Sequence, residues 1–131
     1  MILADASFIV ATISANDAYY DASMKALKSI REPLISTWPC ITEAMHLIGL
    51  RRHEALRRQI EEGFLLLHTS TQEGLLRCCV LMRKYEDSPM DFADASLVAA
   101  AEALEITRIL TYDQHFYSYR INGSIPFEVM P

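Results

Sequence analysis

The chain has 131 residues, of which 51% are hydrophobic and 22% are charged, the balance of an ordinary globular protein. We therefore expect a single domain over residues 1–131, with a core that needs neither disulfides nor a structural metal. The formal net charge of −5 argues against a protein that coats nucleic acid by general neutralisation of phosphates. It leaves open an enzyme that meets nucleic acid through one local basic patch.

The same composition favours a cytoplasmic protein. The longest charge-free run, residues 6–16, is shorter than the roughly 18–20 apolar residues that a membrane span needs. No basic segment precedes an apolar stretch at the start, so we expect no signal peptide. The 3 cysteines include no C-x-x-C pair, so neither a zinc site nor a disulfide framework is predicted, and we expect reduced thiols.

Short apolar runs alternate with segments of helical period along the first part of the chain. The run MILA (1–4) predicts a buried strand, and SFIVATISA (7–15) predicts a helix. Asp17 can cap a second helix, which is followed by a strand candidate, LIS (34–36). The apolar face expected for the second helix comprises Tyr19, Ala22, Ala26, Leu27 and Ile30.

The middle of the chain continues this alternation. A helix is predicted from about Pro39 to the arginine cluster RRHEALRR (51–58), and Gly63 separates it from a third strand, FLLLH (64–68). The segment TQEGLLRCCVLMRKYED (71–87) predicts an amphipathic helix. Its expected inward residues are Leu75, Leu76, Cys79, Val80 and Met82.

The last third predicts a buried helix and two strands. An alanine-rich helix follows Asp91, RILTYD (108–113) reads as a strand and turn, and FEVM (127–130) as a final strand. Strands that alternate with helices predict an α/β domain of three layers, with a mainly parallel central sheet between helices. In such sheets, ligands bind beyond the carboxyl ends of the strands.

Two aspartates follow predicted strands. Asp5 comes directly after MILA, and Asp113 follows RILT, so both belong to the carboxyl edge of the sheet. Each also has an ordinary structural interpretation. Asp5 can cap the next helix, a role that Ser7 could fill equally well, and Asp113 can bond its own backbone in a turn. Neither residue alone identifies a functional site.

Glu43 lies within the predicted helix ITEAMHLIGL (41–50), where its i+4 and i+7 neighbours are Leu47 and Leu50. It is therefore expected near an apolar stripe and not on an obvious solvent face. A partly buried glutamate needs a partner, because its desolvation is costly. The simpler interpretation is a rim position whose side chain reaches solvent.

Asp91 and Asp94 form the strongest local pattern, because residues at i and i+3 share one face at the start of a helix. Ser88 and Pro89 can begin the helix with Asp91 at the third position, or Asp91 can itself be the cap with Asp94 at the third position. Either alternative leaves one aspartate unexplained. Since the following helix is apolar nearly all round, a carboxylate in its first turn should face a cavity.

Taken together, these acids predict a metal site. Carboxylates gathered on one edge of a sheet cannot all stay ionised without a cation, because each raises the pKa of the others. A hard divalent cation relieves this repulsion, and ligation by oxygen alone selects Mg²⁺ or Mn²⁺ over zinc.

The ordered motifs DAS (5–7), TEA (42–44), DFADASLVAAAEAL (91–104) and TYDQHF (111–116) resemble those of PIN-domain nucleases. Within that family the chain is similar to the VapC-type toxins of toxin–antitoxin pairs, and the resemblance covers essentially the whole sequence. It implies a PIN-like fold and a metal-dependent endoribonuclease. The acidic quartet of the family falls on Asp5, Glu43, Asp94 and Asp113.

The resemblance also implies roles for these residues. Asp5 and Asp94 match the metal ligands. Asp113 would complete the coordination sphere or hold a metal-bound water, and Glu43 would orient or deprotonate the attacking water. The supporting residues are Ser7 and Thr111, which match small hydroxyl residues of the pocket, and Asp91, an additional acid.

Further expectations concern partners. The arginines that could contact the RNA backbone are Arg51, Arg52, Arg57 and Arg58, although they equally suit a solvated helix face paired with Glu54. The resemblance implies a cognate antitoxin, whose arginine or lysine would enter among the carboxylates, and a homodimer. The competing interpretation is a catalytically silent PIN-like module held by a protein partner. A phosphatase of the haloacid-dehalogenase type is disfavoured because Ser7 stands where that class needs a second acid.

Overall fold

The computed structural model describes the whole chain, residues 1–131. Five parallel strands form the central sheet in the order β3-β2-β1-β4-β7. They are β1 (Ile2–Ala4), β2 (Leu34–Thr37), β3 (Leu65–His68), β4 (Arg108–Leu110) and β7 (Glu128–Met130). A separate antiparallel hairpin, which the sequence did not predict, consists of β5 (Arg120–Ile121) and β6 (Ile125–Pro126). The expected parallel sheet is confirmed.

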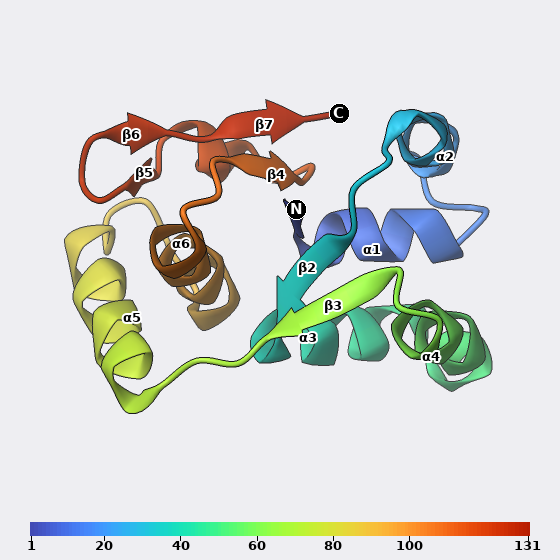
Figure 1. Cartoon of the computed structure of the whole chain (residues 1–131), viewed down its shortest axis with the longest axis horizontal. Helices are drawn as coiled ribbons and strands as arrows, with labels where there is room; N and C mark the ends of the chain where they lie inside the picture. Colours follow the sequence, from blue (N-terminus) through green and yellow to red (C-terminus); the bar gives the residue numbers. More distant parts are fainter.

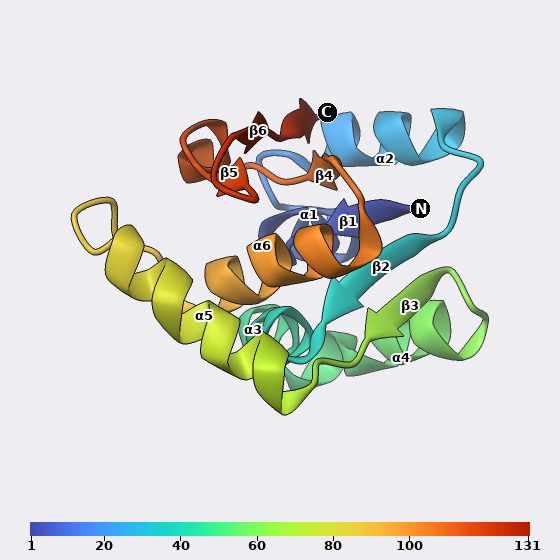
Figure 2. The ribbon, with the colours of Figure 1, turned by 60° about the vertical axis from the view of Figure 1, so that its left-hand side comes forward.

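Helices cover both faces of this sheet and complete the expected three layers (Figures 1 and 2). The first four lie on one side and the last two on the other. Their bounds are α1 (Ala6–Ile13), α2 (Tyr20–Ser29), α3 (Trp38–Ile48), α4 (His53–Glu61), α5 (Gln72–Lys84) and α6 (Phe92–Leu104). Two short 3₁₀ helices are η1 (Leu50–Arg52) and η2 (Gln114–Tyr117).

The central strand β1 shows why the sheet is buried on both faces. Because successive side chains of a strand point to opposite faces, Leu3 packs into the cluster beneath α5 and α6, whereas Ala4 packs against α1 and α3. Ile2 joins a third cluster, with Phe8 and Leu110. The run is therefore continuously apolar and does not alternate, as is typical of parallel strands.

The predicted second and third helices differ from those observed. α2 begins at Tyr20, and Asp17 stabilises the preceding turn by accepting the backbone N–H of Tyr19 at 2.8 Å. The helix expected from about Pro39 to the arginine cluster corresponds to α3, which ends slightly earlier, at Ile48, because Gly49 has a φ of +78° in the left-handed region. The arginine cluster consequently occupies η1 and α4.

The prediction of the inward face of α5 was wrong. Cys78 and Leu81 are its buried residues, and Met82 packs partly against them. The other expected core residues are exposed: Leu75, Leu76, Cys79 and Val80. The apolar residues of α5 are distributed over all of its sides, so their spacing in the sequence does not identify the buried face. Arg77 of α5 also forms an ion pair with Glu102 of α6, at 2.8 Å.

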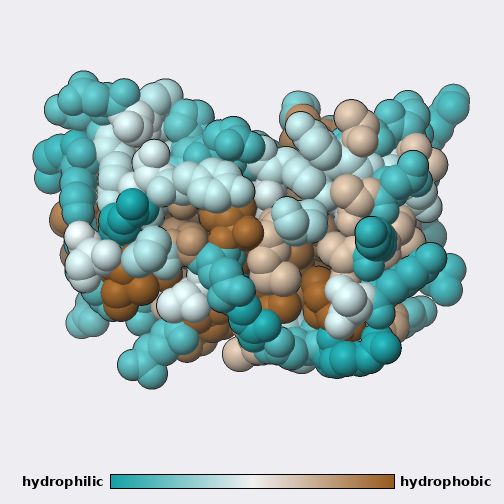
Figure 3. Space-filling view, turned by 90° about the horizontal axis from the view of Figure 1, so that it is seen from above, coloured by the Kyte–Doolittle hydropathy of each residue, from teal (hydrophilic) through white to brown (hydrophobic).

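The surface seen from above combines polar ends with an apolar middle. Hydrophilic side chains cover the end with the β5–β6 hairpin and the end with α2, and apolar patches appear between them (Figure 3). No helix is long and apolar enough to cross a membrane. Cys40, Cys78 and Cys79 are free thiols.

The observed orientation of α5 predicts different costs for two leucine truncations on the same helix. Leu81→Ala should lower the free energy of unfolding by about 2–4 kcal/mol, because Leu81 is fully buried and its loss leaves a cavity. Leu76→Ala should change it by no more than about 0.5 kcal/mol, since Leu76 is 57% exposed. Urea denaturation of the two variants measures the difference, and equal costs would contradict the described face.

Candidate active site

The site begins where two neighbouring strands end. β1 pairs with β4 so that Ala4 lies opposite Leu110, and the backbone N–H of Asp5 donates to the carbonyl of Leu110 at 3.0 Å. The residues that follow the two strands, Asp5 on one side and Thr111 to Asp113 on the other, therefore lie side by side. This edge is the carboxyl edge at which α/β sheets bind ligands.

Asp5 is held by three donors. Its carboxylate accepts the N–H of Ala6 at 2.7 Å and the hydroxyls of Ser7 at 3.0 Å and Thr111 at 2.7 Å. Asp5 is thus the N-cap of α1 and also the centre of a hydroxyl network. Burial raises its pKa, although these hydrogen bonds act in the opposite direction. The expected supporting residues Ser7 and Thr111 both contact Asp5.

Asp91 and Asp94 form a reciprocal capping box, which is the second of the two alternatives drawn from the sequence. Asp91 accepts the N–H of Asp94 at 2.8 Å, and Asp94 accepts the N–H of Asp91 at 3.3 Å. Asp94 is only 7% exposed. Burial, followed by the charges of Asp91 and Asp113, raises the pKa of Asp94 to about 7.

Glu43 lies on α3 and remains exposed as a residue. The leucines on its side of the helix are not packed, since Leu47 is 57% and Leu50 86% exposed, so the expected apolar stripe does not bury it. Partial burial of the carboxyl, and then the charges of Asp91, Asp5 and Asp113, raise its pKa. The Glu43 carboxylate therefore interacts electrostatically with these three aspartates.

Asp113 is both a turn residue and a member of the acidic edge. Its carboxylate accepts the N–H of His115 at 2.9 Å and lies 2.7 Å from His115 Nδ1. Its own N–H donates to Thr111 Oγ1 at 2.9 Å, so the residue is fixed on both sides. The charge of Asp113 contributes to the raised pKa values of Asp5, Glu43 and Asp94.

Five carboxylates therefore share one edge without a protein cation among them. Asp5, Glu43, Asp91 and Asp94 form no ion pair, and Asp113 pairs only with His115. No three His, Cys, Asp or Glu side chains converge as a ready-made metal cluster. This donor set still suits Mg²⁺, which commonly binds one or two carboxylates and keeps several waters.

Two contacts of the site escaped the sequence analysis. The hydroxyl of Tyr119 donates to Asp94 Oδ2 at 3.3 Å, and His115 contacts Asp113. His115 is two residues after Asp113, so the D-x-H spacing could have indicated it. Tyr119 is 25 residues from Asp94, and no local pattern links them.

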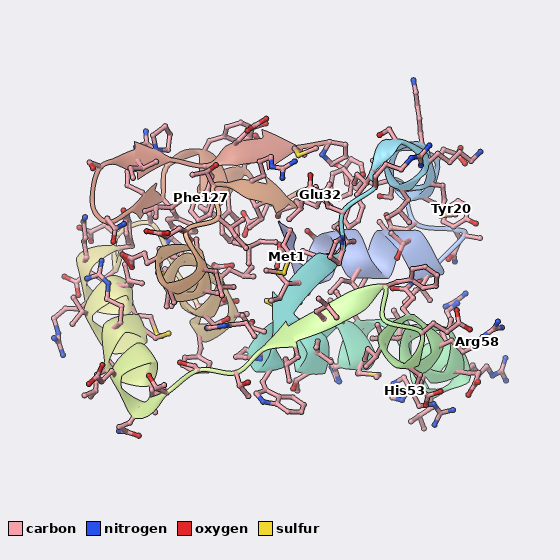
Figure 4. The ribbon with its side chains drawn as sticks, in the orientation of Figure 1. Met1, Tyr20, Glu32, His53, Arg58 and Phe127 are labelled. Carbon is pink, nitrogen blue, oxygen red and sulfur yellow. The ribbon has the colours of Figure 1, made fainter.

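The structure does not bring the arginine cluster to the acids. Arg58 lies at the outer edge of α4, at the lower right of Figure 4, away from the β1–β4 edge. Arg57 pairs with Glu54 at 2.7 Å and Arg58 with Glu62 at 3.6 Å. Arg51 and Arg52 are exposed and form no ion pair.

The raised pKa of Asp94 predicts that this residue destabilises the metal-free protein. The folded state holds the proton up to a pH of about 7, whereas the ordinary pKa of an aspartate is 3.8. Stability should therefore fall as the pH rises from about 4 to about 7, by on the order of 2–4 kcal/mol. Asp94→Asn should remove this slope and raise the melting temperature in chelator above pH 7. Thermal unfolding at several pH values measures both, with Asp87→Asn as the exposed control. A variant less stable than the wild type throughout would contradict the assignment.

Comparison with known proteins identifies the fold and the family of the chain. The chain adopts the fold of VapC20 from Mycobacterium tuberculosis, described as a sarcin–ricin loop cleaving toxin, with a TM-score of 0.86, 19% identity and 100% of both chains covered. A toxin–antitoxin complex from Klebsiella pneumoniae matches with a TM-score of 0.66 and 16% identity, covering 86% of this chain and 87% of the other.

At these identities the two structures establish a shared fold. A comparison with curated proteins finds no significant match. The family model of the PIN domain, however, matches residues 2–122, nearly the entire sequence. The chain therefore belongs to the PIN-domain family.

Proposed function

We propose that this protein is a metal-dependent endoribonuclease that hydrolyses RNA phosphodiester bonds and acts in the cytoplasm as the toxin of a toxin–antitoxin pair. The observation that carries the proposal is the set of five carboxylates on one edge of the sheet, none of which pairs with a lysine or arginine. Burial and the neighbouring charges raise the pKa values of three of them, Asp5, Glu43 and Asp94. Membership of the PIN-domain family and the fold shared with a toxin that cleaves the sarcin–ricin loop support it.

In this proposal, Asp5 and Asp94 hold a Mg²⁺ or Mn²⁺ ion. Their oxygen atoms suit a hard divalent cation, and both side chains are fixed in advance, Asp5 by Ser7 and Thr111 and Asp94 by its capping box. When bound, the ion supplies Lewis-acid polarisation of the phosphate and activation of water. Burying two negatively charged carboxylates is unfavourable, and the positive charge of the ion offsets this cost.

The remaining residues orient groups and move protons. Glu43 Oε orients the attacking water and accepts its proton, a role suited to an exposed carboxylate whose pKa is raised by partial burial and by the neighbouring aspartates. Asp113, fixed by Thr111 and His115, completes the oxygen set or holds a further water. Asp91 keeps the first turn of α6 in place and adds negative charge beside Asp94.

Two partner surfaces accompany this activity. Arg51 and Arg52 form no ion pair and are proposed to contact the RNA backbone beyond the active site. A homodimer is proposed to form over a cavity of about 460 Å³ between α5, α6 and the start of α3. Trp38 and Phe92, which line this cavity, are 59% and 42% exposed.

The proposed activity predicts cleavage of RNA by the purified chain in Mg²⁺ or Mn²⁺. Chelator or Asp5→Asn should reduce cleavage of a total-RNA pool by at least about a hundredfold, because each removes the ion that stabilises the reacting phosphate. Gel electrophoresis and end sequencing identify the RNA that is cut and the position of the cut.

The alternative, a binding module without catalysis, makes a different prediction. A wild-type chain that binds Mn²⁺ but leaves RNA intact would favour it. Asp94→Asn serves as the control for the site itself, since it should weaken Mn²⁺ binding measured by calorimetry while the domain stays folded. Unchanged Mn²⁺ affinity in that variant would overturn the proposed metal site.

A cognate antitoxin should bind this chain and suppress its activity. We expect a small partner, encoded beside the gene of this protein, that places an arginine or lysine among the carboxylates and replaces the charge of the ion. Co-purification of the two proteins tests this expectation, with cleavage recovered when the basic residue of the partner is replaced. Absence of any such partner in the neighbouring gene would contradict the toxin role without affecting the nuclease activity.

A further inference from the structure

Two tyrosines form a stacked pair beside the acidic edge. Tyr19 immediately precedes α2, and Tyr112 follows Thr111 at the end of β4. Their ring centroids are 4.0 Å apart and their planes differ by 10°. Tyr112 is half-buried, whereas Tyr19 is 50% exposed. Because one face of the Tyr19 ring covers Tyr112, the opposite face is the one presented to solvent.

This stack is fixed to the proposed metal ligand by short contacts. The N–H of Tyr112 donates to Ser7 Oγ at 3.0 Å, and the Ser7 hydroxyl donates to Asp5 at 3.0 Å. The Tyr112 hydroxyl lies 2.6 Å from Ser23 Oγ of α2, and the Phe8 ring stacks near Tyr112 with centroids 6.3 Å apart. The exposed ring therefore has a defined position relative to the active site.

The exposed ring has no role in capping the helix that follows it. The side chain of Tyr19 forms no capping hydrogen bond, although the residue occupies the N-cap position of α2. Asp17 organises the turn instead, through its bond to the Tyr19 backbone. A rigid aromatic face without such a structural task is the feature that base stacking uses.

The charge of the protein gives a reason for such a contact. The net charge is −5, and no lysine or arginine forms an ion pair with the five acids, so the edge itself repels RNA phosphates. Affinity near the cleavage point must come from the bound ion and from uncharged contacts. Stacking of a nucleobase on an aromatic side chain is an uncharged contact that tolerates any sequence.

We infer that the outer face of Tyr19 binds an unpaired nucleobase of the RNA substrate, next to the phosphodiester that is cleaved. This inference rests on the proposed ribonuclease activity and adds a substrate class to it. A base inside a duplex is stacked on both faces, so the Tyr19 subsite selects single strands and loops with extruded bases.

The test measures binding separately from cleavage. The probe is a fluorescein-labelled, unstructured RNA of about 12 nucleotides, with Ca²⁺ in place of Mg²⁺ so that a divalent charge is present. Anisotropy should show that Tyr19→Ala and Tyr19→Leu weaken binding about ten- to a hundredfold, while Tyr19→Phe binds as the wild type. Tyr19→Leu keeps an apolar cover over Tyr112, so it guards against misfolding of Tyr19→Ala.

Two controls separate stacking from a structural effect. Tyr20→Ala should leave RNA affinity unchanged, because Tyr20 lies at the right-hand edge of the molecule, away from the sheet (Figure 4). A probe of equal length without bases should bind the wild type and the Tyr19 variants with the same weak affinity.

Equal binding of the base-containing RNA by wild type and Tyr19→Leu would overturn the subsite, as would a wild type that does not bind it. Either result leaves cleavage of the total-RNA pool as an independent test of the nuclease. Binding that depends on Tyr19, in a protein that cuts no RNA, would instead overturn the proposed activity. If only binding of a protein partner depends on Tyr19, the face is a protein contact and the inference fails.

Discussion

The parallel pairing of β1 with β4 is the constraint on which the site depends. It brings residues more than 100 positions apart into one network, in which Ser7 and Thr111 both donate to Asp5. Both strands end in buried apolar residues, Ala4 and Leu110, and this burial fixes the position of the edge. The polar residues that directly follow the strands form the proposed site. A shift of the pairing by one residue would reverse the faces of the strand and disperse the network.

Three of the acids have a structural task beside the chemical one that we propose for them. Asp5 caps α1, Asp91 caps α6, and Asp113 caps η2. Negative side chains at helix starts are favourable, because the backbone N–H groups and the helix dipole carry partial positive charge there. The fold thereby holds several carboxylates close together at a lower electrostatic cost than isolated side chains would incur. Burial, and then the repulsion that remains, raise the pKa of Asp94.

The sequence predicted the elements whose patterns are local. Continuous apolar runs such as residues 1–4 indicated the strands, and the alternation of strands with helices indicated the parallel sheet. The inward side of α5 could not be predicted, because Leu76 and Leu81 are equally apolar and only the docking of α6 distinguishes them. The end of α3 at Ile48 was expected slightly later, at the arginine cluster, because Leu50 continues the apolar pattern beyond Gly49.

The site shows the same division between local and long-range information. The order of the acids along the chain, together with the resemblance to a family, indicated which residues to examine. The choice between two caps near Asp91 required the backbone geometry, and the contact of Tyr119 with Asp94 required the tertiary structure. The roles proposed for Glu43 and Asp113 could not be derived from local sequence patterns, because each role depends on residues that other helices and strands contribute.

The capping roles also bear on how such a domain can change over time. Replacing Asp5 or Asp91 by an apolar residue removes a helix cap as well as a charge, so the loss of chemistry weakens the fold too. Glu43 differs, because it is exposed, lies within a helix and forms no hydrogen bond or ion pair that the fold requires. If Glu43 has the role that we propose, a descendant could lose catalysis and keep the scaffold for another task most easily by replacing this one residue.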